Sequence, residues 1–133
     1  QIPYHSGLKG HSDGDVIIHS IIDALLGAMR KRDIGTFFPD NKKKFKNIRS
    51  PKLLKPIIEI LNKNDFYINN LDINLICEKP KVSKYRDKII SSLSNLINLD
   101  KNLINLKGKT VEKLGLIGKE KAIACEVICS ISE

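Results

Sequence analysis

The sequence predicts a single α/β (α+β) domain, a sandwich in which helices cover one face of a mixed β-sheet. Three observations lead to this prediction. Apolar residues at helical spacing alternate along the chain with apolar residues at strand spacing, no linker or internal repeat divides the 133 residues, and 41% of them are apolar. A domain near this size buries roughly two thirds of its unfolded surface. We therefore expect residues 1–133 to fold around one core, which is mostly aliphatic because Trp is absent.

The first predicted helix spans about residues 13–29. Ser12 and Asp15 form an S-x-x-D pattern, in which each side chain can satisfy a free backbone amide at the start of a helix. The apolar residues that follow recur at helical spacing: Val16, Ile17, Ile21, Ile22, Leu25, Leu26 and Met29. A further strand is expected before residue 11.

Residues 30–50 are predicted to form a long loop, a kind of segment that is often functional or mobile in compact domains. A second helix is expected to begin at Ser50 and Pro51, since Ser is a good cap and Pro is tolerated in the first turn. Pro56 should kink this helix or delay its start. The apolar face of the helix consists of Leu53, Leu54, Ile57, Ile58 and Leu61.

The rest of the chain predicts a strand, a helix and two more strands. Residues 67–78 alternate as a strand does, with Leu71, Ile73 and Leu75 on one side. Ser83 is expected to cap a helix whose apolar face carries Ile89, Ile90, Leu93, Leu96 and Ile97. Residues 103–109 and 122–131 are predicted strands, the last with Ile123, Cys125, Val127, Cys129 and Ile131 on one face.

The net charge of +8 indicates either a basic surface or an anionic ligand, which could be nucleic acid or a phosphorylated small molecule.

The cysteines are odd in number and form no C-x-x-C pair, which argues against a disulfide framework or a Cys-based zinc site; they are Cys77, Cys125 and Cys129. They are expected to be buried small apolar residues. No apolar run approaches the roughly 18 residues of a membrane span.

Asp15, His19 and Asp23 lie four residues apart, which puts them on one side of the first helix. His11 lies near the same end of that helix. The stripe could hold a metal or a phosphate, or it could be a solvated face opposite the buried one. The free amides and the dipole of the helix N-terminus favour an anion there.

Three segments look like turns: Asp33-Ile34-Gly35, Phe38-Pro39-Asp40 and Pro80-Lys81. Two of the further candidate segments could bind a ligand. Asp33-Ile34-Gly35 could hold a sugar diol, and Pro80-Lys81 follows a strand. Lys107-Gly108-Lys109-Thr110-Val111-Glu112 ends a strand in small, basic and hydroxyl residues, which suit phosphate, with Glu112 as an oxygen ligand for Mg²⁺. An ordinary helix cap at Thr110 is the alternative.

These segments together resemble the 2-C-methyl-D-erythritol 2,4-cyclodiphosphate synthase family over essentially the whole chain. The most specific block is His11-Ser12-Asp13-Gly14-Asp15-x3-His19-x3-Asp23-Ala24-Leu25-Leu26-Gly27-Ala28. The other blocks follow in the family's order: Asp33-Ile34-Gly35-x2-Phe38-Pro39-Asp40, Asn70-x-Asp72, Pro80-Lys81, Lys107-x2-Thr110-x-Glu112-Lys113-Leu114-Gly115, Gly118 and Ile123-Ala124-Cys125-Glu126.

The resemblance implies a homotrimer with active sites between subunits. The implied enzyme is a metal-dependent phosphorus–oxygen lyase of non-mevalonate isoprenoid biosynthesis. It converts 4-diphosphocytidyl-2-C-methyl-D-erythritol 2-phosphate into the cyclic diphosphate and CMP, with Zn²⁺ and with Mg²⁺ or Mn²⁺. The family occurs in plastids and in bacterial cytoplasm. The Lys-, Asn- and Ile-rich composition favours a plastid (apicoplast-type) stroma.

The resemblance also assigns roles to residues. It implies contacts to the substrate phosphates from His11 and Ser12, to the methylerythritol hydroxyls from Asp40 and to the ribose from Asp33 and Gly35. Cytosine and the α-phosphate are expected between the Cys77 to Ser83 turn, which includes Pro80 and Lys81, and the segment of Gly108, Lys109 and Thr110. The metal ligands implied are His19 for zinc and Glu112 for Mg²⁺ or Mn²⁺. Asp15, Asp23 and Lys119 are expected in supporting roles, and His11, Ser12, Thr110 and Asp40 as catalytic residues.

Two departures from the family pattern affect these expectations. The family's zinc site also uses an Asp-x-His pair upstream of the position at which this sequence begins, and His19 alone is not the three-ligand set of a catalytic zinc. Lys119 stands where the family often has Arg and offers a point charge instead of a planar fork. Two other classes stay open: a metal-dependent phosphohydrolase that uses the same helix stripe, and a basic nucleic-acid-binding domain without catalysis.

Overall fold

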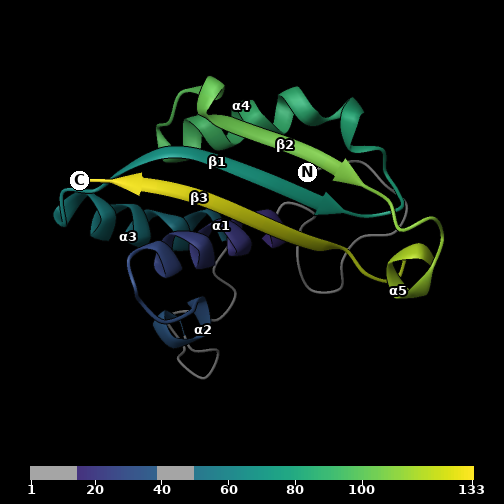
Figure 1. The fold of residues 1–133 in the computed structure, drawn as a ribbon, viewed down its shortest axis with the longest axis horizontal. Coiled ribbons are helices and arrows are strands. Elements are labelled where there is room, and N and C mark those ends of the chain that lie inside the picture. The colour runs from purple at the N-terminus through teal and green to yellow at the C-terminus, as the bar shows by residue number, and fades with distance from the viewer. Residues whose placement is uncertain (1–14, 39–49) are drawn as a thin grey trace.

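A computed structural model describes residues 15–38 and 50–133. They form a three-stranded sheet in the order β2-β1-β3 (Figure 1). The strands are β1 (Tyr67–Ile76), β2 (Ile104–Lys109) and β3 (Ala124–Ser132). Because β1 pairs parallel with β2 and antiparallel with β3, the predicted mixed sheet is confirmed.

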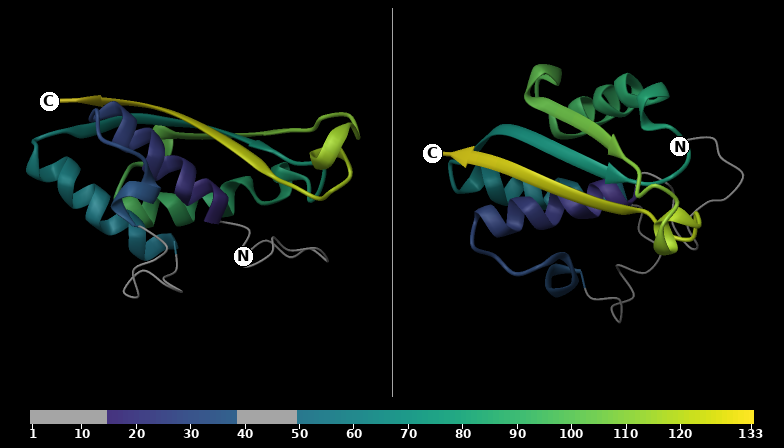
Figure 2. Two further views of the ribbon diagram at one scale, coloured as in Figure 1. Left: turned by 90° about the horizontal axis from the view of Figure 1, so that it is seen from below. Right: turned by 45° about the vertical axis from the view of Figure 1, so that its right-hand side comes forward.

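Three helices, α1 (Asp15–Ala28), α3 (Ser50–Lys63) and α4 (Arg86–Ile97), lie on the same face of the sheet (Figure 2). α1 packs on β3 and against α3, and α4 packs on β2. This arrangement confirms the prediction that helices cover one face. The opposite face of the sheet carries no helix in the part of the chain that the structure describes (Figure 2).

The core lies between the sheet and the helices. Burial along β1 alternates from residue 70 to residue 76, as the apolar pattern of this strand predicts. Side chains of α1 at helical spacing complete the interior. Fully buried residues from these two elements are Ile17, Ile21, Ile22, Leu25, Leu26, Leu71 and Ile73.

Pro56 lies inside α3, which runs without interruption from Ser50 to Lys63. The predicted delay in the start of this helix is therefore wrong. A proline removes one backbone hydrogen bond from the helix interior. Packing offsets this loss, because Leu54, Ile57 and Leu61 are each at most 2% exposed against the core.

Two short helices, α2 (Ile34–Phe37) and α5 (Gly115–Gly118), are absent from the sequence prediction. α2 lies in the segment predicted to be a loop. One turn of helix is too short to show apolar periodicity, so local contacts define it. Asp33 caps α2, since its Oδ1 accepts hydrogen bonds from the amide and the hydroxyl of Thr36 at 3.2 and 2.9 Å.

The start of the helix after β1 differs from the prediction. Ser83 does not cap α4, because it lies inside a preceding 3-10 turn, η2 (Val82–Lys84). The residue at the N-cap is Tyr85, whose side chain makes no capping hydrogen bond. Leu96, expected on the apolar face of α4, is 39% exposed. The strand expected before residue 11 lies outside the described residues, and among those residues no helix is long and apolar enough to cross a membrane.

Candidate functional site

A pocket lies where the parallel strands β1 and β2 end. Ile76 and Lys109 pair at the last position of the two strands, and the amide of Cys77 donates to the carbonyl of Lys109 at 2.9 Å. Parallel strands end at the same edge of a sheet, where ligands of α/β proteins commonly bind. The cavity has a volume of about 320 Å³. Its lining consists of Cys77, Glu78, Pro80, Lys81, Val82, Ser83, Arg86, Leu106, Gly108, Lys109 and Thr110.

This pocket brings together the candidate residues from two separate segments of the sequence: Pro80, Lys81, Gly108, Lys109 and Thr110. Thr110 caps no helix, since the residue at the N-cap of α5 is Leu114. Sequence reasoning included Glu78 only as part of the Cys77 to Ser83 turn, without singling it out, and it missed Arg86 of the lining. The signal that could have pointed to them is their place directly after β1 and at the start of α4.

Gly108 allows the two walls of the pocket to come close together. A Cβ atom at this position would lie 2.7 and 2.9 Å from Cβ and Cγ2 of Val82, which is closer than real Cβ atoms come to their neighbours. Val82 itself is buried, 7% exposed, so it has little room to retreat. Position 108 therefore requires a glycine for packing reasons.

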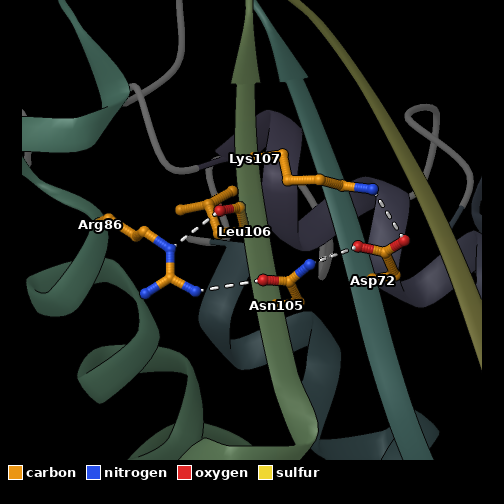
Figure 3. Close-up of polar contacts among 5 residues, drawn as sticks. All are labelled: Asp72, Arg86, Asn105, Leu106 and Lys107. Atoms are coloured by element: carbon orange, nitrogen blue, oxygen red, sulfur yellow. Dashed lines mark hydrogen bonds and ion pairs between the residues drawn. The ribbon is translucent and has the colours of Figure 1, made fainter.

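Cationic groups surround the pocket. Lys81 and Lys109 are exposed residues of its lining, and Arg86 is half-buried at its α4 side. The guanidinium of Arg86 is held in place, because Nε donates to the carbonyl of Leu106 at 3.0 Å and Nη2 donates to Oδ1 of Asn105 at 3.1 Å (Figure 3). This concentration of positive charge suits an anionic ligand.

The contacts of Arg86 continue across the sheet (Figure 3). Nδ2 of Asn105 donates to Oδ1 of Asp72 at 3.2 Å, and Nζ of Lys107 donates to Oδ2 of Asp72 at 3.0 Å. The hydrogen bond from Lys107, the positive charge of its ammonium group and the bond from Asn105 together lower the pKa of Asp72 against a smaller opposing effect of burial. The network thus ties α4, β2 and β1 together beside the pocket.

The turn after β2 is fixed by a carboxylate from the opposite segment. Oε1 of Glu78 accepts hydrogen bonds from the backbone amides of Val111 and Lys113, both at 2.9 Å. Glu112, which lies between these two residues, and Lys113 both have a left-handed backbone, with φ of 54° and 66°. Glu112 is an exposed residue of this turn.

The candidate residues on α1 lie in another part of the fold. His19 is half-buried, and Asp23 is exposed. Oδ1 of Asp23 accepts a hydrogen bond from the amide of Ile34 at 2.7 Å, so it holds the first residue of α2. Asp33 and Gly35, the expected ribose contacts, are exposed at α2 and are not part of the pocket lining.

The other candidate residues are only partly described. His11, Ser12 and Asp40 lie outside the described residues. Asp15 is the first residue of α1, which fits the expected start of that helix. Lys119 is an exposed residue at the C-cap of α5.

The two expected metals differ in how well the described residues suit them. Within residues 15–38 and 50–133, no three His, Cys, Asp or Glu side chains come together in a way that could hold a metal ion. A catalytic zinc takes three protein ligands, so zinc at His19 would require donors from outside these residues. Mg²⁺ is usually held by one or two carboxylates plus substrate phosphates, and the exposed Glu112 suits that role.

A mixed sheet covered on one face by helices, with a basic pocket at the carboxyl ends of its two parallel strands, defines the chain as an α+β protein whose pocket suits an anionic ligand. The chain belongs to the YgbB family, whose model matches residues 1–132. It is 54% identical to the bifunctional enzyme IspD/IspF of Pelagibacter ubique over 131 residues, which are 98% of this chain and 35% of that protein. The chain therefore spans about a third of the length of this relative.

Two further comparisons involve proteins of more similar length. The chain is 48% identical to the 2-C-methyl-D-erythritol 2,4-cyclodiphosphate synthase of Wigglesworthia glossinidia brevipalpis over 132 residues, or 99% of this chain and 83% of that protein. Among solved structures, it is similar to IspF of Plasmodium falciparum in complex with CDP. That similarity has a TM-score of 0.79 and 43% identity, and it covers 92% of this chain and 72% of the other.

Proposed function

We propose that this chain is a 2-C-methyl-D-erythritol 2,4-cyclodiphosphate synthase, a lyase of non-mevalonate isoprenoid biosynthesis. The observation that carries the proposal is the pocket at the ends of β1 and β2. It gathers the five residues expected around cytosine and the α-phosphate: Pro80, Lys81, Gly108, Lys109 and Thr110. The CDP complex of the similar Plasmodium falciparum structure supports a cytidine nucleotide as the ligand class.

In the proposed reaction, an oxygen of the substrate's 2-phosphate attacks the β-phosphorus of its diphosphate. A new phosphorus–oxygen bond closes the ring as the bond from the β-phosphorus to the bridging oxygen breaks. That oxygen leaves with the α-phosphate as CMP. Such a transfer needs positioning and charge neutralisation more than covalent help from the protein.

The pocket can supply both requirements. Backbone groups of the segments around Pro80 and Gly108 enclose the base and fix the nucleotide. Lys81 and Lys109 provide positive charge for the phosphates, which helps CMP to leave as an anion. Glu112 would hold Mg²⁺ or Mn²⁺, and the ion would supply positive charge that neutralises the charge developing on the phosphates. Asp23 would support the ribose contacts of Asp33 and Gly35 by fixing α2.

We further propose that the protein acts as a homotrimer. The face of the sheet opposite the helices carries Ile128, which is 72% exposed. A large apolar side chain exposed on this face suits contact with a neighbouring subunit, as the family resemblance implies. Light scattering should give three times the chain mass, and a monomer mass would contradict the shared active site.

The ligand proposal is tested by thermal unfolding with nucleotides. CDP and CMP should raise the melting temperature, while ADP and AMP should not, because the proposed base site is expected to bind cytosine. Equal shifts from both bases would favour the metal-dependent phosphohydrolase. No shift from any nucleotide, together with steep salt-dependent binding of generic DNA or RNA in fluorescence anisotropy, would favour the nucleic-acid-binding domain.

The metal proposals are tested by two substitutions. Glu112→Gln should raise the Mg²⁺ or Mn²⁺ concentration that gives half-maximal turnover, and an unchanged dependence would count against Glu112 as a ligand. His19→Ala should abolish turnover and remove zinc from a form of the protein that includes an Asp-x-His segment upstream. Full activity with bound zinc in that variant would rule out the ligand role of His19.

For the place of action, we propose bacterial cytoplasm, with a plastid (apicoplast-type) stroma as the alternative. The two sequence relatives described above are bacterial proteins, which supports the first, while the similar solved structure is from Plasmodium falciparum. The genomic sequence upstream of Gln1 distinguishes the two, because a plastid protein would be preceded by a Ser- and Arg-rich transit segment.

A further inference from the structure

We propose that Glu78 is a positioning residue of the active site: its carboxylate holds the turn that presents Glu112, so that the nucleotide pocket and the divalent-ion site are built as one unit. This inference rests on the proposed function for the role of Glu112. Glu78 itself belongs to the lining of the pocket. Its bonds to the turn are made by the same side chain, at 2.9 Å each.

The turn needs such support because its backbone is in a strained conformation. Two consecutive residues with side chains, Glu112 and Lys113, have φ of 54° and 66°. Left-handed backbones are unfavourable for residues other than glycine and persist only where the surroundings determine them, most often at functional sites. One oxygen of Glu78 accepts from the amides on both sides of Glu112. The carboxylate thus fixes the residue between them.

A second contact also restrains the turn. A Cβ atom at Gly118 would lie 2.1 Å from the backbone carbon of Lys113, so α5 is packed directly on the backbone of the turn. Gly118 also donates its amide to the carbonyl of Leu114 at 2.9 Å. Because Glu78 accepts from two of its amides and α5 packs on Lys113, the turn has little freedom. The carboxylate of Glu112 is therefore presented by a rigid turn although its side chain is exposed.

The arrangement explains why an acidic side chain is tolerated in an otherwise basic pocket. A carboxylate near the phosphates of a substrate would repel them unless its charge were satisfied. The two amide donors satisfy one oxygen of Glu78 and direct its charge toward the turn. Residues that orient a metal ligand typically change metal affinity or activity by about 10- to 100-fold when they are substituted.

Three substitutions at one position separate the possible causes. Glu78→Gln keeps an oxygen that can accept both amides and should stay close to the unchanged protein. Glu78→Ala removes the acceptor, and Glu78→Asp keeps the charge but withdraws the oxygen by one methylene. Both should raise the Mg²⁺ concentration for half-maximal turnover by about tenfold or more. In metal-free protein, both should also speed hydrogen exchange at the amides of Val111 and Lys113, measured by NMR.

Asp100→Ala is the matched control. Oδ1 of Asp100 accepts from the amide of Asn102 at 2.8 Å and so caps the turn at the opposite end of β2. Its loss should destabilise that turn without changing the Mg²⁺ dependence or the hydrogen exchange at Val111 and Lys113.

If Glu78→Ala and Glu78→Asp leave the hydrogen exchange at Val111 and Lys113 and the Mg²⁺ dependence unchanged while CDP still binds, the positioning role is wrong and the proposed function stands. If the unchanged protein neither binds CDP nor turns over, the proposed function itself fails, and the role with it.

Discussion

Gly108 on β2 and Val82 on η2 are so close that a single added carbon would not fit between them: a Cβ at Gly108 would lie 2.7 Å from Cβ of Val82. The contact joins the segment that follows β1 to the end of β2. It also fixes how far apart the two walls of the pocket stand. The width of the candidate nucleotide site is therefore set by the absence of one methyl group.

Gly108→Ala should displace Val82 and its segment and thereby distort the pocket. Overpacking of this kind typically costs about 1–3 kcal/mol of stability. The melting-temperature shift produced by CDP should fall well below that of the unchanged protein. Gly27→Ala is a suitable control, because a Cβ at Gly27 in α1 would meet no atom within 4 Å. That variant should gain stability, by at most about 1 kcal/mol, and keep the CDP shift. An intact CDP shift in Gly108→Ala would show that the contact does not shape the site.

Asp23→Ala should release the start of α2, because Oδ1 of Asp23 accepts from the amide of Ile34 at 2.7 Å. A hydrogen bond at an exposed position contributes about 0.5–1.5 kcal/mol, so the loss of stability should be small. The expected change is a higher KM for the substrate with little change in kcat, since the ribose contacts at Asp33 and Gly35 lose their support. Asp23→Asn keeps an oxygen that can accept this bond and should restore KM. A normal KM in Asp23→Ala would mean that α2 does not take part in binding.

The sequence predicted the long elements well because each buries one regular face. The apolar residues that define the helical spacing on α1 and the alternation on β1 are fully buried in the structure, as for Ile21, Leu25 and Ile73. The short elements failed for the same reason. α2 is one turn held by the carboxylates of Asp23 and Asp33, and such contacts leave no periodic pattern.

The site was predictable in its parts but not in its assembly. Pro80 stood out as part of a turn and Gly108 as part of a possible phosphate site at a strand end. They meet only because β1 and β2 are parallel and end together at Ile76 and Lys109. The bond from Glu78 to the amide of Val111 spans 33 positions of sequence. No local pattern reveals that an acidic residue accepts from backbone so far along the chain. Recognition of the family pattern supplied the grouping that local patterns did not.

The three cysteine thiols should react slowly with alkylating agents in the folded protein. They are free, as the sequence predicted, with Cys77 buried and Cys125 and Cys129 half-buried. Burial raises the pKa of each thiol above its ordinary value of 9.0, and the charge of Glu78 adds to this for Cys77. Less of the reactive thiolate is therefore present at pH 8 than in a free cysteine. Iodoacetamide labelling followed by mass spectrometry should be slow in buffer and fast in concentrated urea. Rapid labelling of the folded protein would contradict the burial.

Asp72→Asn should weaken the protein in a manner that depends on pH. The hydrogen bond from Lys107 lowers the pKa of Asp72 below its ordinary value of 3.8 in the folded state. At pH values near 3.8 and below, the unfolded chain therefore binds more protons at this residue than the folded chain does. The stability that ionised Asp72 contributes is fully present above pH 3.8 and is lost as the pH falls through the lowered pKa. Urea unfolding should show Asp72→Asn to be less stable than the unchanged protein at pH 7, with the difference shrinking below pH 3.8.

Lys107→Met tests whether the ion pair is the cause. At pH 7, adding Lys107→Met to the Asp72→Asn variant should cost less stability than Lys107→Met costs in the unchanged protein, because the partner of Lys107 is already changed. High salt should reduce the effect of each single variant, since the Lys107 and Asp72 side chains are 42% and 34% exposed. A stability difference between Asp72→Asn and the unchanged protein that stayed constant from pH 7 into strong acid would exclude titration of Asp72 as its source. In that case the loss of stability would come from the hydrogen bond that Asn105 donates to residue 72, because that bond does not depend on pH when residue 72 is uncharged.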